Sequence, residues 1–145
     1  MKSTIEEIFK QTKSNIYESV EHDKKRSTFL GTLLHASGNV HELHLLEKVY
    51  SKHVILDDLY KYLPELVDSL IEKDMATNGF LKKYINDNES LMSSNPIEYV
   101  ENLRQFTFDM RKELYDDKKN SNIWSLIDDI LDTYDECLYK LENLK

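Results

Sequence analysis

Apolar residues recur every three or four positions along most of the chain, the spacing of a helix with one buried face. The first series follows Ser3 or Thr4, with Glu6 or Glu7 three residues further on, which is the pattern of a capping box. We therefore predict a first long helix that runs to about Glu47. Its apolar positions include Ile5, Ile8, Phe9, Ile16, Tyr17, Val20, Phe29, Leu30, Leu33 and Leu34.

A second helix is predicted from about Ser51 to Ala76, because Asn78 and Gly79 suit a left-handed C-terminal cap. Pro64 lies inside this segment. A proline within a helix removes one amide donor and crowds the preceding turn, at a cost on the order of 3 kcal/mol, so we expect a kink there. The alternative is two helices that meet near Leu63, with the proline at the first position of the second.

Two more helices follow a polar crossover. Asn95 and Pro96 mark the start of the third helix, and the fourth begins near Ser121. Four amphipathic helices with a longer connection between the second and the third predict an all-α fold, a ferritin-like four-helix bundle with a long crossover, in a single domain over residues 1–145. The apolar positions of these two helices are Ile97, Val100, Leu103, Phe106, Met110, Ile123, Trp124, Ile127, Ile130, Leu131, Tyr134, Leu138 and Leu141.

The composition agrees with a soluble, helix-rich domain. The 145 residues are 40% hydrophobic and 32% charged, with three glycines and two prolines. The single cysteine, Cys137, excludes an intrachain disulfide framework, and we expect it in the core. The sequence contains neither a targeting segment nor a run of eighteen apolar residues, so the predicted location is the bacterial cytoplasm, with no membrane partner.

The charge pattern argues against nucleic-acid binding. The net charge is −8, and phosphate recognition needs clustered basic residues. Lys24, Lys25 and Arg26 form one short basic run, which we expect to be solvated. DNA is therefore not a predicted partner.

Four side chains of the second helix form a ligand-like stripe. At ~100° per residue, His53, Asp57, Asp68 and Glu72 fall at roughly 0°, 40°, 60° and 100°. His53 and Asp57 are one turn apart, as are Asp68 and Glu72, but the midpoints of the two pairs are about 22 Å apart along a helix. One metal ion can bind all four only between two chains, with two copies of this helix antiparallel about a two-fold axis. Asp74 and Asp58 lie off the stripe and are predicted to be solvated.

The stripe resembles the ferroxidase site of the mini-ferritins, the family of DNA-binding proteins from starved cells. That family marks its intersubunit site with a His, a second His twelve residues later, an Asp four on, an Asp eleven further and a Glu four beyond. The strings HVILDDLY and DSLIE and the terminal NG are also similar to the second helix of the family. The matching residues here are His41, His53, Asp57, Asp68 and Glu72.

This resemblance implies Fe(II) binding at a two-fold dimer interface and oxidation by peroxide or oxygen. The ferric product would then be stored in a cage of twelve chains. Two imidazoles and three carboxylates suit iron, with Mn(II) or Zn(II) as competitors. His44, one turn from His41, is a candidate to support the ligands or to replace one of them.

The chain also departs from the mini-ferritin pattern. Glu42 stands where the family has Trp, and the Lys-rich tail that many members use on DNA is missing. The string HELHLLEKVYSKH is similar to a pattern in small ferritin-like proteins carried by tailed phages. The alternative function is therefore a non-catalytic ferritin-like module for assembly or protein interaction, of the kind that a phage encodes. A classical ferritin site within one bundle needs paired Glu-x-x-His motifs, and the sequence has none.

Overall fold

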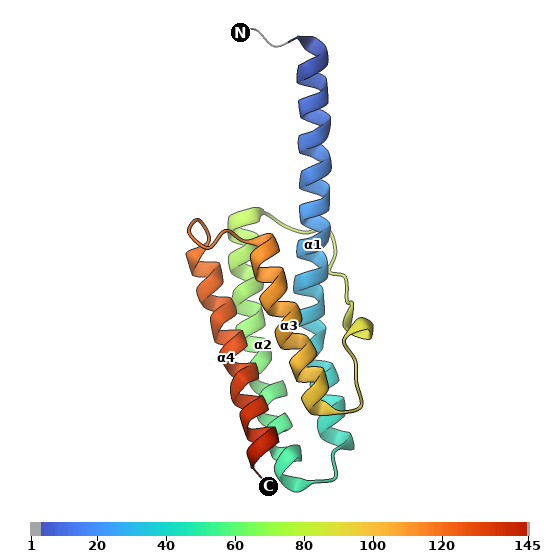
Figure 1. Cartoon of the computed structure of the whole chain (residues 1–145), viewed down its shortest axis with the longest axis vertical. Helices are drawn as coiled ribbons and strands as arrows, with labels where there is room; N and C mark the ends of the chain where they lie inside the picture. Colours follow the sequence, from blue (N-terminus) through green and yellow to red (C-terminus); the bar gives the residue numbers. More distant parts are fainter. Residues whose placement is uncertain (1–3, 145) are drawn as a thin grey trace.

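The computed structural model describes residues 4–144, and this part of the chain contains four α-helices, one short 3-10 turn and no strand (Figure 1). The all-α prediction with four long helices is confirmed. The helices are α1 (Ile5–Leu46), α2 (Tyr50–Asn78), α3 (Pro96–Leu114) and α4 (Ser121–Asn143), and the 3-10 turn η1 spans Asn88–Ser90.

The helix ends follow the local signals in the sequence. Thr4 and Glu7 form the predicted capping box at the start of α1, each side chain pairing with the other residue's backbone amide. Gly79 ends α2 with a φ of 88°, a conformation that glycine adopts without steric cost. The Asn95 side chain caps α3 by accepting from the amide of Ile97.

The helices pack side by side, with α1 and α4 each lying against both α2 and α3. α1 and α4 run in one direction and α2 and α3 in the other (Figure 1). Because α2 and α3 are parallel, the chain between them must travel along the bundle, and residues 79–95 do so beside α1. The core holds the largest fully buried apolar side chains of all four helices: Phe29, Leu30, Leu33, Leu56, Leu63, Leu70, Tyr99, Leu103, Ile123, Ile127 and Tyr134.

Small and polar side chains of α1 hold the crossover in place. The Ser27 hydroxyl donates to the carbonyl of Lys83 at 2.6 Å, and the carbonyl of Ser27 accepts from the amide of Ile85 at 3.1 Å. The hydroxyl and carbonyl oxygens of Thr32 both accept hydrogen bonds from the crossover, at Asp87 and Asn88. Gly31 lies between these residues, and a Cβ atom there would overlap the backbone of Ile85. The close approach of the crossover therefore requires glycine at this position.

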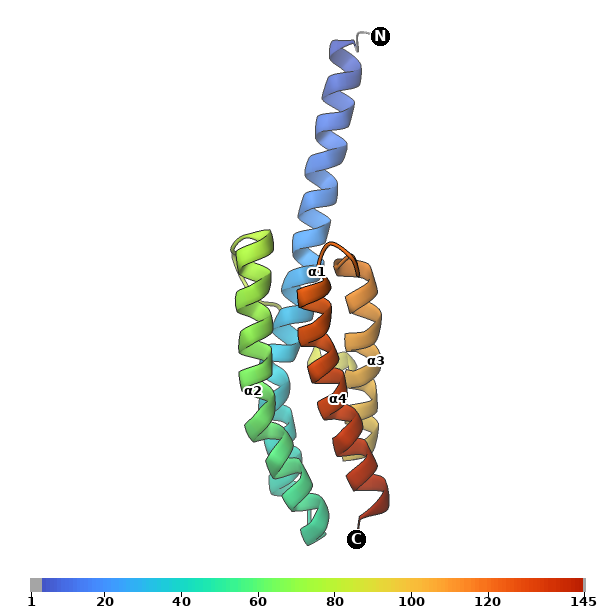
Figure 2. The ribbon, with the colours of Figure 1, turned by 90° about the vertical axis from the view of Figure 1, so that its left-hand side faces the viewer.

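α2 continues through Pro64 as one helix, so the alternative of two helices meeting near Leu63 is wrong. Figure 2 shows that α2 bends along its length, as expected of a helix that contains a proline. No helix among residues 4–144 combines the length and apolar character that crossing a membrane requires.

The first turns of α1 extend beyond the other three helices (Figure 1 and Figure 2). We call this segment, residues 5–20, the stalk. All of its residues are exposed, whereas α1 is part of the packed bundle from Arg26 onward.

Candidate functional site

Three histidines meet where α1 turns into α2. α1 ends at Leu46 and α2 begins at Tyr50, so the last turns of one helix face the first turns of the next. This turn brings together five side chains that we call the histidine corner: His41, His44, His53, Asp57 and Tyr60.

His44 and His53 are held by reciprocal hydrogen bonds. The Nδ1 atom of each ring lies 2.7–2.8 Å from the backbone carbonyl of the other residue, and the rings stack with centroids 3.7 Å apart. A carbonyl oxygen only accepts, so each Nδ1 carries the proton and donates it. In the neutral ring the lone pair then lies on Nε2, as in histidines that bind a metal through one nitrogen while the other holds a backbone oxygen.

Asp57 faces His44 and is kept ionised by its neighbours. Its Oδ1 atom lies 3.6 Å from Nε2 of His44, and its Oδ2 atom accepts a 2.8 Å hydrogen bond from Nζ of Lys61. The bond from Lys61 is the largest cause that lowers the pKa of Asp57, and the Tyr60 hydroxyl adds to it. The corner therefore presents a carboxylate, not a carboxylic acid, at neutral pH.

His41 joins the corner through Tyr60. The two rings stack in parallel, with centroids 4.1 Å apart and planes at 9°, and His41 remains exposed. The hydrogen bond to Asp57 is the main cause that raises the pKa of Tyr60. Tyr60 thus links His41 to the carboxylate, and three of the five predicted ligands, His41, His53 and Asp57, lie in one corner.

Asp68 and Glu72 lie elsewhere. Both are exposed on α2, beyond Pro64 and towards the end of the helix opposite the histidine corner. Glu72 borders a hollow of about 520 Å³ between α2 and the start of α4. Within the part of the chain that the structure describes, His, Cys, Asp and Glu form no group of three or more placed to hold a metal ion. A site made of all five residues therefore needs a second copy of the chain.

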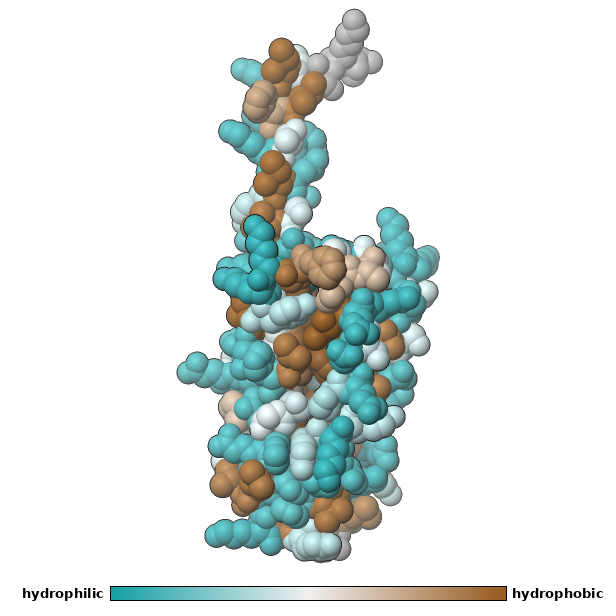
Figure 3. Space-filling model, turned by 180° about the vertical axis from the view of Figure 1, so that it is seen from behind, coloured by the Kyte–Doolittle hydropathy of each residue, from teal (hydrophilic) through white to brown (hydrophobic). Residues whose placement is uncertain are grey.

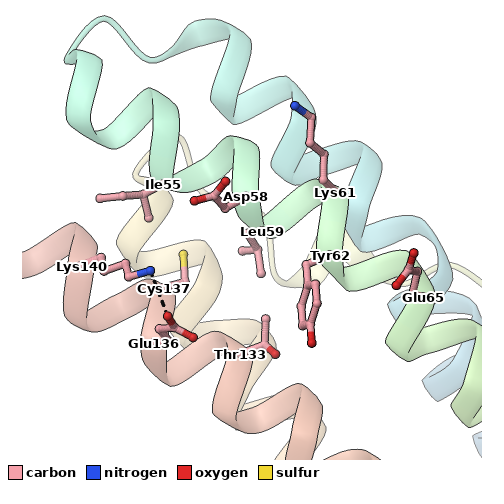
Figure 4. Close-up of a pocket in the computed structure, with 10 residues that line it drawn as sticks. All are labelled: Ile55, Asp58, Leu59, Lys61, Tyr62, Glu65, Thr133, Glu136, Cys137 and Lys140. Carbon is pink, nitrogen blue, oxygen red and sulfur yellow. Dashed lines mark ion pairs between the residues drawn. The ribbon is translucent and has the colours of Figure 1, made fainter.

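A groove between α2 and α4 is the other candidate site (Figure 4). It has a volume of about 440 Å³, with Ile55, Leu59 and Cys137 among its apolar lining. Its charged side chains are Asp58, Lys61, Glu65, Glu136 and Lys140, and the last two form a 2.9 Å ion pair. Burial raises the pKa of the Cys137 thiol to about 12. The thiol is therefore protonated at neutral pH, and the residue is part of the buried core, as predicted.

Comparison with known proteins gives a family for most of the bundle. Residues 44–141 match the model of a family of unknown function, DUF5856. The chain belongs to this family. None of the curated proteins or solved structures compared with the chain matches it. The DUF5856 match begins at His44, so it takes in α2, α3 and nearly all of α4 but not the stalk.

Two charged residues that we predicted to be solvated are buried instead. Arg26 and Asp74 are 1% and 0% exposed, and the guanidinium donates to the carboxylate through Nε at 3.2 Å and Nη2 at 2.5 Å. Tyr115 and Asn78 also donate to Asp74, and Arg26 donates to the carbonyl of Gly79. The prediction failed because a buried charge is tolerated only when it is paired, and the partners lie 48 residues apart.

A sequence signal for this pair existed. Arg26 lies three and four residues before Phe29 and Leu30, and Asp74 lies four residues after Leu70. Each charged residue therefore falls on the apolar stripe of its own helix, where an unpaired charge would be costly. An acid and a base that both interrupt apolar stripes are candidates for a buried pair.

Proposed function

We propose that this chain is a ferritin-like protein that binds Fe(II) between two copies of α2 and oxidises it. Parallel α2 and α3 joined by a crossover along the bundle are typical of ferritin-like topology, which supports the proposal. The observation that carries it is the position of the five candidate ligands. The corner gathers His41, His53 and Asp57, and the exposed Asp68 and Glu72 lie further along the same helix.

The spacing along α2 suits a two-fold axis. Asp57 and Asp68 are equally far from the point between Tyr62 and Leu63, and His53 and Glu72 are also equally far from it. If two α2 helices pack antiparallel with that point on the axis, Asp57 of one copy is level with Asp68 of the other, and His53 is level with Glu72. Two equivalent sites then form, each with ligands from both copies.

The donor atoms suit iron as substrate. Nε2 of His53 is the free ring nitrogen, and the carboxylates supply hard oxygen ligands, a set that Fe(II), Mn(II) and Zn(II) all accept. Hydrogen peroxide takes two electrons, one from each of two Fe(II) ions, and its O–O bond breaks. The ferric ions then react with water to give ferric oxyhydroxide and protons. The net charge of −8 attracts the cation.

The test is Fe(II) consumption by the purified chain with peroxide, followed spectroscopically. We expect His53→Ala and Asp68→Ala each to lose the activity, whereas Asp58→Ala, which removes an exposed carboxylate off the stripe, should retain it. An unchanged rate in the two ligand variants would refute the proposal.

Complementation gives a sharper test. In a dimer of one His53→Ala chain and one Asp68→Ala chain, both substitutions fall in the same site and the other site is intact. The two inactive variants are mixed under conditions that let chains exchange between dimers. About half of the dimers then contain one chain of each kind, and each of these has one intact site of two, so about a quarter of the wild-type sites should be restored. Intrachain sites would stay inactive in the mixture.

A second candidate is a non-catalytic module for assembly or protein interaction. The exposed apolar residues of the stalk favour it, because apolar side chains in line on a solvated helix mark an interaction surface. Metal analysis and mass measurement of the purified chain separate the two functions. A stable oligomer that takes up no iron supports the second.

A further inference from the structure

Within residues 4–144, no other helix packs against the stalk. Residues 5–20 of α1 are exposed throughout, and α2, α3 and α4 do not reach them (Figure 1 and Figure 2). The stalk continues α1 without a break, and the rest of the described chain buries none of its residues.

One face of the stalk is apolar. Ile5, Ile8, Phe9, Ile16 and Val20 fall within ~120° around the helix, and Tyr17 lies ~60° beyond this arc. These six side chains are 54–76% exposed. Figure 3 shows the apolar side chains following one another along the stalk. An exposed apolar stripe of this kind marks a surface that a partner covers.

The charges of the stalk argue against a phosphate-bearing partner. Residues 5–20 carry Glu6, Glu7 and Glu18 against Lys10 and Lys13, and Glu21 follows directly. Amphipathic helices that bind anionic lipid, and surfaces that bind nucleic acid, are instead rich in basic residues. The partner is therefore another apolar protein surface.

The order of the apolar residues points to a second stalk. Ile5 and Val20 are equally far from the point between Thr12 and Lys13, and so are two further pairs, Ile8 with Tyr17 and Phe9 with Ile16. If a second stalk lies antiparallel to the first with this point in common, each of the six apolar residues is level with an apolar residue of the other copy. We propose that the stalk pairs with the stalk of a second copy, antiparallel and in this register.

The size of the pair is that of a stable interface. At about 200 Å² for each large side chain, the six residues expose roughly 750 Å² per copy, so two stalks bury at most on the order of 1,500 Å². Stable protein interfaces bury about 1,200–2,000 Å². Full burial of the six side chains of each copy therefore reaches the size of a stable interface.

The surroundings of the stalk fit the same register. Sixteen helical residues span about 24 Å, so the two bundles lie at opposite ends of the paired stalks and do not overlap. The tip of the partner stalk then reaches the root of the first. Phe80, 85% exposed, is next to Gly79, whose carbonyl accepts from Arg26, so a further exposed apolar side chain lies near that root. This contact is separate from the α2 surface and does not depend on iron binding.

The first test is the mass of the full chain in solution, by sedimentation equilibrium, with Phe9→Gln/Ile16→Gln against the control Glu7→Gln/Glu18→Gln. The control changes the opposite face of the stalk at matched positions. We expect the particle mass of the apolar variant to fall, to half where the stalks are the only contact between copies, and that of the control to stay at the wild-type value. An apolar variant with the wild-type mass, or a wild-type chain that is monomeric, overturns the proposal. In the monomeric case a different protein covers the stripe.

The second test fixes the direction of pairing. Ile5→Cys and Val20→Cys chains are mixed and oxidised, and the buried Cys137 is left in place. Antiparallel pairing predicts disulfides between position 5 of one chain and position 20 of the other. If only links between identical positions form, the stalks are parallel and the proposed register is wrong. Fe(II) oxidation by the Phe9→Gln/Ile16→Gln variant is measured alongside. If this variant still oxidises Fe(II), stalk pairing and the iron site are independent of each other, and each proposal can be refuted without the other.

Discussion

The buried pair of Arg26 and Asp74 offers a quantitative test of how the bundle is held together. Arg26→Met keeps the apolar body of the side chain as far as the position of Nε and removes its charge. The Asp74 carboxylate then stays buried with two donors, the hydroxyl of Tyr115 at 2.8 Å and Nδ2 of Asn78 at 3.1 Å. Removing one partner of a buried ion pair costs about 3–5 kcal/mol. The two remaining donors place the expected loss near the lower end, about 3 kcal/mol.

Urea unfolding followed by circular dichroism measures this loss. With a slope of about 1–3 kcal/mol per molar urea, a loss of about 3 kcal/mol moves the midpoint down by roughly 1–3 M. Lys25→Met is the matched control, because Lys25 and its partner Glu113, 3.6 Å away, are about half exposed. An exposed pair contributes about 0–1 kcal/mol, so the control should unfold close to wild type.

A double variant separates charge burial from packing. Asp74→Asn in the Arg26→Met background removes the unpaired buried charge and keeps the shape of the side chain. We expect it to unfold at a higher urea concentration than Arg26→Met alone. If Arg26→Met lies within about 1 kcal/mol of wild type, the carboxylate is not desolvated as described and the reasoning fails.

Three further outcomes can be measured on single variants or on the wild type. Gly31→Ala should lose about 1–3 kcal/mol in urea unfolding because its methyl group displaces the crossover, whereas Gly38→Ala, in open space on the same helix, should gain about 0.5–1 kcal/mol. Cys137, with a pKa near 12, should resist a thiol reagent at pH 8 until the chain is unfolded; rapid labelling of the folded chain would contradict this. Asp57 should titrate below 3.8 by NMR, so the stability that it contributes is present above that pH and is lost on acidification. Lys61→Met should raise the pKa of Asp57, since the hydrogen bond from Lys61 is the main cause that lowers it.

The sequence alone predicted the helices and several of their ends. The capping box of Thr4 and Glu7, the start of α3 at Asn95 and Pro96, and the glycine that ends α2 were all expected and are all present. These features depend on hydrogen bonds and backbone angles within about four residues, so a short stretch of sequence is enough to determine them. Pro64 shows the limit, because whether the helix bends or breaks depends on how the neighbouring helices pack.

The candidate ligands illustrate the same limit. The spacing of His53 and Asp57 predicted that they share a helix face, as they do. Their contacts with His44 and Tyr60 depend on the angle at which α1 turns into α2, which no local pattern encodes. The intersubunit iron site stays a prediction, because its remaining ligands must come from a second copy.

Sequence periodicity determined which face of each helix is apolar, and tertiary structure decided which of those faces are covered. The stripe of the stalk has the same spacing as that of the core segment of α1, yet it is exposed because α2, α3 and α4 do not reach it. Arg26 and Asp74 show the converse, two charged residues that are buried because folding brings them together across 48 positions. Helical periodicity comes from contacts between near neighbours in the chain, whereas burial depends on the distance to every other element in space.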